Sequence, residues 1–156
     1  MKKIISVFIF YALFVSCNPP DEIHLLPDNY IGVVLIMHEQ KDGADEIFEN
    51  GDLVYTIPSD GVLKTKSAPI EGVLTIRYFY LRDNKRVELK YYGDYKLIPE
   101  DSIGVFGLSV GHSWLDGTDT NSPKIYYTKY LVGTKSDAES LFKLKNKLSP
   151  SDYLKK

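Results

Sequence analysis

The feature that most constrains the fold is a series of short runs rich in valine, isoleucine and tyrosine, separated by residues that favour turns. β-branched and aromatic residues are enriched in strands, whereas glycine, proline and asparagine mark the connections between them. About seven such runs at this spacing are typical of a β-sandwich. The predicted strands are 31–37, 53–57, 62–66, 73–82, 86–92, 103–110 and 125–132.

The clearest pair of strands is a hairpin around Asp83-Asn84-Lys85, after which apolar and charged residues alternate from Arg86 to Tyr91. Alternation with a period of two is the pattern of a half-buried strand, and a short polar turn joins antiparallel neighbours. A second turn is predicted at Pro58–Gly61, and Gly104 and Gly107 indicate a bulge in the strand that contains them. We therefore expect an all-β fold, an antiparallel β-sandwich of about seven strands.

One helix is predicted near the C-terminus. Ser136 and Glu139 have the spacing of a capping box, and Ala138, Leu141 and Phe142 provide an apolar stripe that would face a sheet. The helix is expected to run to about Leu148. Residues 150–156 are expected to form a frayed tail.

The first seventeen residues indicate where the protein goes. Lys2 and Lys3 precede a nearly unbroken apolar run, and small residues lead to Cys17, the only cysteine of the chain. This is the pattern of a bacterial secretory signal that ends in a lipobox, with residues 1–16 removed and Cys17 acylated. A plain cleaved signal peptide is the main alternative, because Phe14 stands where lipoboxes usually carry leucine. A transmembrane helix needs about 20 apolar residues, and this run is shorter.

These features define the expected domains and surroundings. Residues 17–29 are predicted to be a lipidated N-terminus and a proline-rich tether, and residues 30–149 a single domain. The expected location is the bacterial cell envelope, with the lipid bilayer as a partner through Cys17. The formal net charge is −2 and no long basic run occurs, which argues against a nucleic-acid partner.

The candidate contact region lies around residues 111–123, which are predicted to be a polar loop. Loops at the end of a β-sandwich often carry recognition, and exposed tryptophan and tyrosine often carry binding energy. We therefore predict that aromatic rings contact a protein or glycan partner, with two carboxylates that orient it. The predicted contact residues are Trp114, Tyr126, Tyr130, Asp116 and Asp119. The alternative for Trp114 is that it closes the end of the core.

No catalytic residue, cofactor or metal ligand is predicted. Gly111-His112-Ser113-Trp114-Leu115 begins like a nucleophile elbow, but Leu115 stands where the second glycine is needed. The three histidines have no spacing that would form a zinc site. The function that best fits these features is a non-enzymatic binding or scaffolding module. An envelope hydrolase or glycan-processing enzyme that uses Asp116 and Asp119 beside His112 is the alternative.

Several segments together resemble a family of small bacterial proteins that is known largely as a domain of unknown function. They are Leu26-Pro27, Tyr30-x-Gly32-x-Val34, Tyr55-x-Ile57-Pro58-x-x-Gly61-Val62-Leu63-x-Thr65, Phe79-Tyr80 and Val132-Gly133-Thr134. Many members of that family are envelope lipoproteins of Bacteroidota type. The resemblance implies a transthyretin-like (prealbumin-like) β-sandwich and a place in the envelope, and it carries no catalytic or binding residues.

Overall fold

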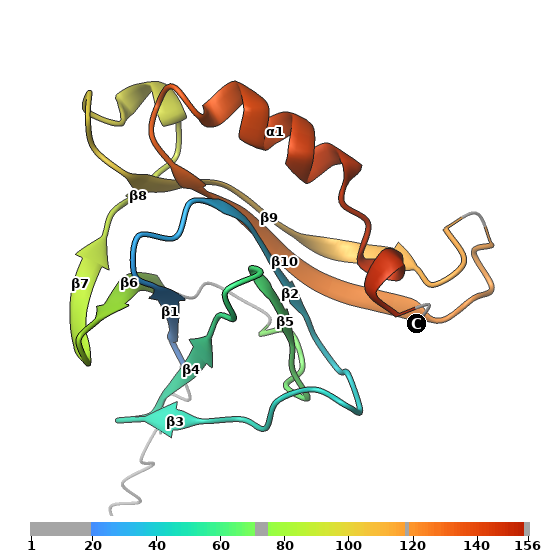
Figure 1. Cartoon of the computed structure of the whole chain (residues 1–156). Helices are drawn as coiled ribbons and strands as arrows, with labels where there is room; N and C mark the ends of the chain where they lie inside the picture. The colour runs from blue at the N-terminus through green and yellow to red at the C-terminus, as the bar shows by residue number, and fades with distance from the viewer. Residues whose placement is uncertain (1–19, 71–74, 118, 155–156) are drawn as a thin grey trace, which may run out of the picture.

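The computed structural model describes residues 20–70, 75–117 and 119–154. Within them, ten strands form two five-stranded sheets that pack against each other, as Figure 1 shows. The first sheet has the order β3 (Phe48–Glu49), β4 (Asp52–Thr56), β1 (Glu22–Pro27), β6 (Ile76–Arg82) and β7 (Lys85–Leu89). The second has the order β5 (Val62–Lys64), β2 (Gly32–Met37), β10 (Lys124–Gly133), β9 (Gly104–Trp114) and β8 (Tyr91–Tyr92).

The two-sheet architecture agrees with the sequence prediction, but the expectation of purely antiparallel pairing was wrong. β1 pairs in parallel with both β4 and β6, and β2–β5 and β8–β9 are also parallel pairs. The count of seven was too low because β1, β3 and β8 were not recognised. β3 and β8 have only two residues each, so they leave no periodic pattern in the sequence.

β1 corrects the predicted tether, which was placed at residues 17–29. Glu22–Pro27 is the central strand of the first sheet and is buried along nearly its whole length. The polar, proline-rich residues 18–22 suggested a solvated linker. Glu22 and His24 are instead buried and bonded to each other, with Glu22 Oε2 2.9 Å from His24 Nε2. The domain therefore begins before residue 30.

The main core lies between the two sheets. Leu26, Tyr78 and Tyr80 of the first sheet contact Val34 and Ile36 of the second within one cluster of buried side chains. Burial of this apolar surface is the principal stabilising contribution in a chain with a single cysteine.

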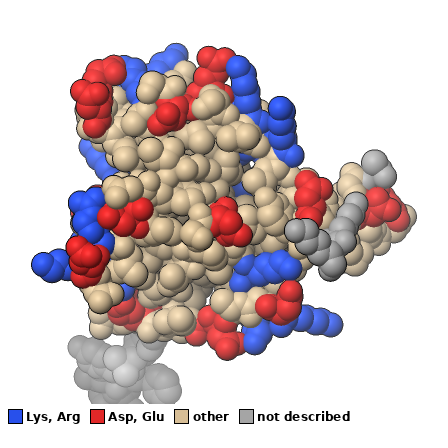
Figure 2. Space-filling model, in the orientation of Figure 1, with Lys and Arg blue, Asp and Glu red and all other residues tan. Residues whose placement is uncertain are grey.

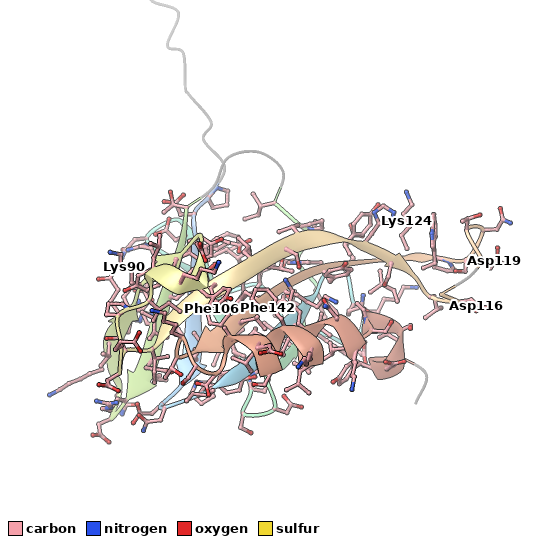
Figure 3. The ribbon with its side chains drawn as sticks, turned by 90° about the horizontal axis from the view of Figure 1, so that it is seen from above. Lys90, Phe106, Asp116, Asp119, Lys124 and Phe142 are labelled. Carbon is pink, nitrogen blue, oxygen red and sulfur yellow. The ribbon has the colours of Figure 1, made fainter. Side chains whose placement is uncertain are left out.

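The outer face of the second sheet is covered by α1 (Ala138–Lys147) and by the short helix η2 (Pro150–Tyr153). Phe106 of β9 and Phe142 of α1 lie side by side, with ring centroids 5.8 Å apart (Figure 3). Pro150 and Ser151 are buried, and Tyr153 and Leu154 pack against Leu35 and Met37 of β2. The segment from residue 150 was predicted to fray, but through residue 154 it contributes to the core.

The helix begins at Ala138 rather than at Ser136, and the predicted capping box does not form. Asp137 occupies the N-cap position, and its carboxylate accepts hydrogen bonds from the backbone N–H and the hydroxyl of Thr134. These bonds lower the pKa of Asp137. Ser136 instead contacts Thr134 Oγ1 at 2.8 Å.

Three turn and bulge predictions are confirmed by the backbone. Gly61 has a φ of +77°, which closes the Pro58–Gly61 turn through a hydrogen bond from Gly61 N to Pro58 O. Asp83 and Asn84 both have positive φ, as expected in a tight turn between β6 and β7. The pairing of β9 with β10 shifts in register beside Gly107, whose φ is +61°.

The predicted signal segment and Cys17 lie outside the described residues. No helix within the described part of the chain is long and apolar enough to cross a membrane.

Candidate binding face on the β9–β10 arm

β9 and β10 are the longest strands, and their paired ends extend away from the body of the molecule as an arm (Figure 1). The pairing continues to Lys124 opposite Trp114, with His112 opposite Tyr126 and Val110 opposite Thr128. Residues 111–114, predicted to begin a polar loop, therefore extend β9. Only residues 115–123 form the connection at the tip.

Aromatic side chains gather on one face of the arm. The ring of His112 lies edge-on to Trp114, with centroids 5.6 Å apart, and 6.0 Å from the ring of Tyr126. The ammonium group of Lys124 lies over the Trp114 ring at 5.2 Å from its centroid. We call His112, Trp114, Lys124 and Tyr126 the aromatic face. His112 is exposed, and Trp114 and Tyr126 are partly exposed.

Strand alternation explains which of the predicted contact residues meet. Tyr126 and Tyr130 point to the same side of β10, the side that faces the first sheet. The first sheet covers the part of β10 that contains Tyr130, which is completely buried against His24 and Tyr78. Tyr126 lies farther out on the arm. Trp114 and Tyr126 thus share an accessible face, whereas the prediction that Tyr130 contacts a partner was wrong.

The two predicted carboxylates lie at the far end of the arm, as Figure 3 shows. Asp116 and Asp119 are both exposed in the connecting turn. Their backbones close the turn through a bond from Asp119 N to Asp116 O, and the Asp119 carboxylate accepts a bond from the Asn121 N–H at 2.8 Å. The three cavities described for this structure are lined by other residues. Both carboxylates are exposed side chains that border the aromatic face.

The opposite face of the arm is packed against the rest of the protein. Ile125 is buried beside Leu35 and Met37, and Tyr127 packs in the same cluster. The ammonium group of Lys129 lies 4.7 Å from the centre of the Tyr127 ring and donates a hydrogen bond to the carbonyl of Leu148. The arm is therefore held from one side, which leaves the aromatic face accessible in a fixed orientation.

A buried polar network lies between the sheets and was not predicted from the sequence. The imidazole of His24 connects Glu22 Oε2, at 2.9 Å, with the Tyr130 hydroxyl, at 3.1 Å. The rings of Tyr55 and Tyr78 stand edge-on to the same imidazole. Burial raises the pKa of Tyr130 well above its usual range, so the phenol stays protonated. The alternation Glu22-x-His24 was the only signal for this network in the sequence.

His38 forms a second buried polar contact beside this network. It follows β2, is 1% exposed, and its Nε2 lies 3.1 Å from Thr128 Oγ1. Its Nδ1 has no hydrogen-bond partner of normal geometry among the described residues. Burial lowers the pKa of His38 to about 4, so the ring is neutral at neutral pH. A cavity of about 20 Å³, lined by Glu22, His38 and Thr128 among others, adjoins the ring.

An open groove of about 440 Å³ lies at the end of α1. It is lined by Tyr30, Val33, Leu144, Lys147, Leu148, Tyr153 and the carboxylates of Asp60 and Asp152. The Tyr30 hydroxyl donates a hydrogen bond to the Val33 carbonyl at 2.7 Å, and burial raises the pKa of Tyr30 to about 12. Tyr30 therefore acts as a structural group that fixes the wall of the groove.

Charged side chains do not form a dominant field on the face drawn in Figure 2. Basic and acidic residues are intermixed around its margin, and uncharged residues cover much of its middle. Within the described residues, no group of three or more histidine, cysteine, aspartate or glutamate side chains is placed to hold a metal ion. The aromatic face of the arm is therefore the strongest candidate site in the described part of the chain.

Comparison with known proteins supports the fold. The crystal structure of a "Putative Lipoprotein from Bacillus anthracis" superposes with a TM-score of 0.50 at 18% sequence identity, and the match covers 72% of this chain and 68% of that one. No curated protein matches the chain in sequence. A model of the DUF6843 family, described as a family of unknown function, matches residues 19–136. Because that match spans most of the chain, the protein belongs to the DUF6843 family.

Proposed function

We propose that this protein is a lipid-anchored module of the bacterial cell envelope that binds a glycan or protein partner through the aromatic face of the β9–β10 arm, without catalysing a reaction. The observation that carries the proposal is the set of three rings, from His112, Trp114 and Tyr126, on an accessible face of the arm. Exposed aromatic rings stack on the apolar faces of sugars and anchor protein partners.

The charged groups near the rings support a binding role. Lys124 lies over the Trp114 ring, and Asp116 and Asp119 follow at the tip of the same arm. Such groups orient a polar partner through hydrogen bonds at the rim of an aromatic contact. A hydrolytic role for the same carboxylates would need a cleft that holds the scissile bond between them, and both side chains are exposed in a turn.

Two observations support the lipid anchor. The lipobox-like segment that ends at Cys17 precedes the domain, and a protein of similar fold carries the name "Putative Lipoprotein". Acylation at this cysteine would supply more than one chain, as stable anchoring requires. A closer relation to Bacteroidota-type lipoproteins and to the prealbumin fold remains a prediction from the sequence resemblance.

The anchor is tested by fractionating cells that express the full chain or the Cys17→Ser variant after labelling with an alkyne-bearing palmitate analogue. We expect label and membrane association in the unaltered protein only. Retention of the variant in the membrane fraction to the same extent would contradict the anchoring proposal.

The binding face is tested with the full chain in detergent, applied to arrays of envelope glycans and to detergent extracts of envelope proteins. We expect Trp114→Ala to abolish the signal while its melting temperature stays within a few degrees of that of the unaltered protein. Phe48→Ala is the matched control, because Phe48 is an aromatic residue of the other sheet and is 55% exposed. A melting temperature lowered by many degrees in Trp114→Ala would instead identify Trp114 as a core residue.

A further inference from the structure

The outer edge of β9 has backbone groups that no described strand pairs with. β8 pairs with β9 only at Val105 and Phe106, near the start of the strand. Toward the arm, no strand among the described residues borders Val110–Trp114 on the side away from β10. Among the described strands, the edge is therefore unpaired along the same part of the arm that carries the aromatic face.

The direction of these groups follows from two hydrogen bonds of the arm. His38 N donates to Tyr126 O at 2.9 Å, so the backbone groups of Tyr126 point toward β2. Tyr126 lies opposite His112 of β9, and these two residues therefore form a pair without backbone hydrogen bonds between them. Leu115 N donates to Pro123 O at 2.8 Å, so the residues of β9 that bond to β10 are the odd-numbered ones, Gly111 and Ser113. Because the pattern alternates, Val110, His112 and Trp114 direct their N–H and C=O groups away from β10.

Between Val110 and Trp114 this edge lacks the charged residues and prolines that usually protect edge strands. Natural edges usually carry charged residues or proline, which prevent another strand from pairing. Three other edge strands follow the rule, since β7 contains Lys85, Arg86 and Glu88, β3 contains Glu49, and β5 contains Lys64. The remaining edge strand, β8, has no charged residue but is only two residues long. From Gly104 to Trp114 there is neither a charged residue nor a proline.

We propose that two copies of this chain pair antiparallel along the free edges of β9, with His112 opposite His112 of the second copy. Val110 then lies opposite Trp114 of the second copy, so that each indole ring meets a small side chain. In this arrangement β9 of one copy pairs with β9 of the other, so a charged side chain on the edge would lie near the same charge on the second copy. The absence of charged residues from β9 avoids this repulsion. The neighbouring small residues Gly111 and Ser113, on the opposite face, leave room for the second backbone.

The pairing would join the two aromatic faces side by side across a twofold axis. The inference rests on the backbone of β9 and does not depend on whether the aromatic face binds a glycan or a protein. Backbone hydrogen bonds supply the affinity in strand addition, and side chains supply its specificity.

The test is the mass of the full chain in detergent, measured by light scattering with the detergent contribution subtracted. We expect a dimer at micromolar concentration. His112→Pro removes an outward N–H without removing a bond to β10, a substitution that edge strands tolerate, and is expected to give a monomer. A monomeric unaltered protein, or a His112→Pro protein that remains dimeric, would overturn the proposal.

A second pair of variants keeps the test valid should the proline disturb the arm. Val110→Asp places a charge on the proposed contact, and Val87→Asp places the same charge on β7, an edge that already carries charges. Val110 is 62% exposed and Val87 is 40% exposed, so both substitutions are compatible with the monomer fold. We expect Val110→Asp to weaken dimerisation at least tenfold and Val87→Asp to leave it unchanged. Equal effects of the two variants would contradict pairing through β9.

Discussion

His38 is expected to make the stability of the domain fall at mildly acidic pH. Its imidazole is buried and contacts Thr128 Oγ1 through Nε2, and burial lowers its pKa from 6.5 to about 4. Above pH 6.5 the ring is neutral in both the folded and the unfolded chain, and it contributes no pH dependence. Between pH 6.5 and 4 the unfolded chain binds a proton that the folded chain does not, so the free energy of unfolding decreases.

The size of the effect follows from the shift. Each pKa unit corresponds to about 1.4 kcal/mol, so the lowering of the His38 pKa predicts a loss of about 3 kcal/mol between neutral pH and pH 4. The charge of Glu22 raises the pKa of His38 and so opposes the effect of burial, whereas the charge of His24 lowers that pKa further. Such a loss is a large fraction of the stability of a small domain.

The assay is urea unfolding of the unaltered protein and of His38→Gln at several pH values between 7.5 and 4. Glutamine keeps an amide donor near Thr128 but does not titrate, so the variant is expected to lose about 3 kcal/mol less than the unaltered protein over this range. His112→Gln is the matched control, because His112 is exposed on the arm. The same pH dependence in the unaltered protein and in His38→Gln would refute the reasoning.

Two further predictions concern the turn and the buried network. Gly61→Val is expected to destabilise the domain by about 2–4 kcal/mol. Gly61 has positive φ, and a Cβ there would lie 2.0 Å from the Tyr30 hydroxyl and 2.5 Å from the Val33 carbonyl. Thermal unfolding measures the loss, and Gly51→Val separates the clash from the backbone strain, because Gly51 also has positive φ but a Cβ there would contact nothing. Tyr130→Phe leaves His24 Nδ1 without its partner and is expected to cost about 1–3 kcal/mol, and an unchanged unfolding midpoint in urea would contradict the importance of that contact.

The strands that the sequence predicted are those with an unbroken apolar or alternating pattern. Residues 31–37 and 125–132 correspond closely to β2 and β10, because both strands are hydrophobic over most of their length. β1 was missed because Glu22 and His24 interrupt its apolar run, and their mutual hydrogen bond, which makes burial possible, cannot be recognised from the residue types alone.

The candidate site was predicted in part for a similar reason. Trp114 and Tyr126 were placed together correctly because they lie near a turn between adjacent antiparallel strands, where local spacing determines proximity. Tyr130 has the same residue type and the same strand face, and only the packing of the first sheet distinguishes it from Tyr126. His112 and Lys124 complete the aromatic face through the cross-strand register, which extends beyond the predicted end of β9.

The central position of β1 has a mechanical consequence. Only Asn18–Asp21 separate Cys17 from β1, and a chain of this length spans at most about 17 Å from Cys17 to Glu22. With the anchor proposed at Cys17, a pull between membrane and domain acts along β1, which is hydrogen-bonded on both sides, to β4 and to β6. The backbone hydrogen bonds from β1 to β4 and to β6 would then be loaded in shear at the same time. An edge strand pulled away from its sheet would instead lose its hydrogen bonds one after another. The domain is thus expected to yield to such a force only when the middle of its first sheet fails.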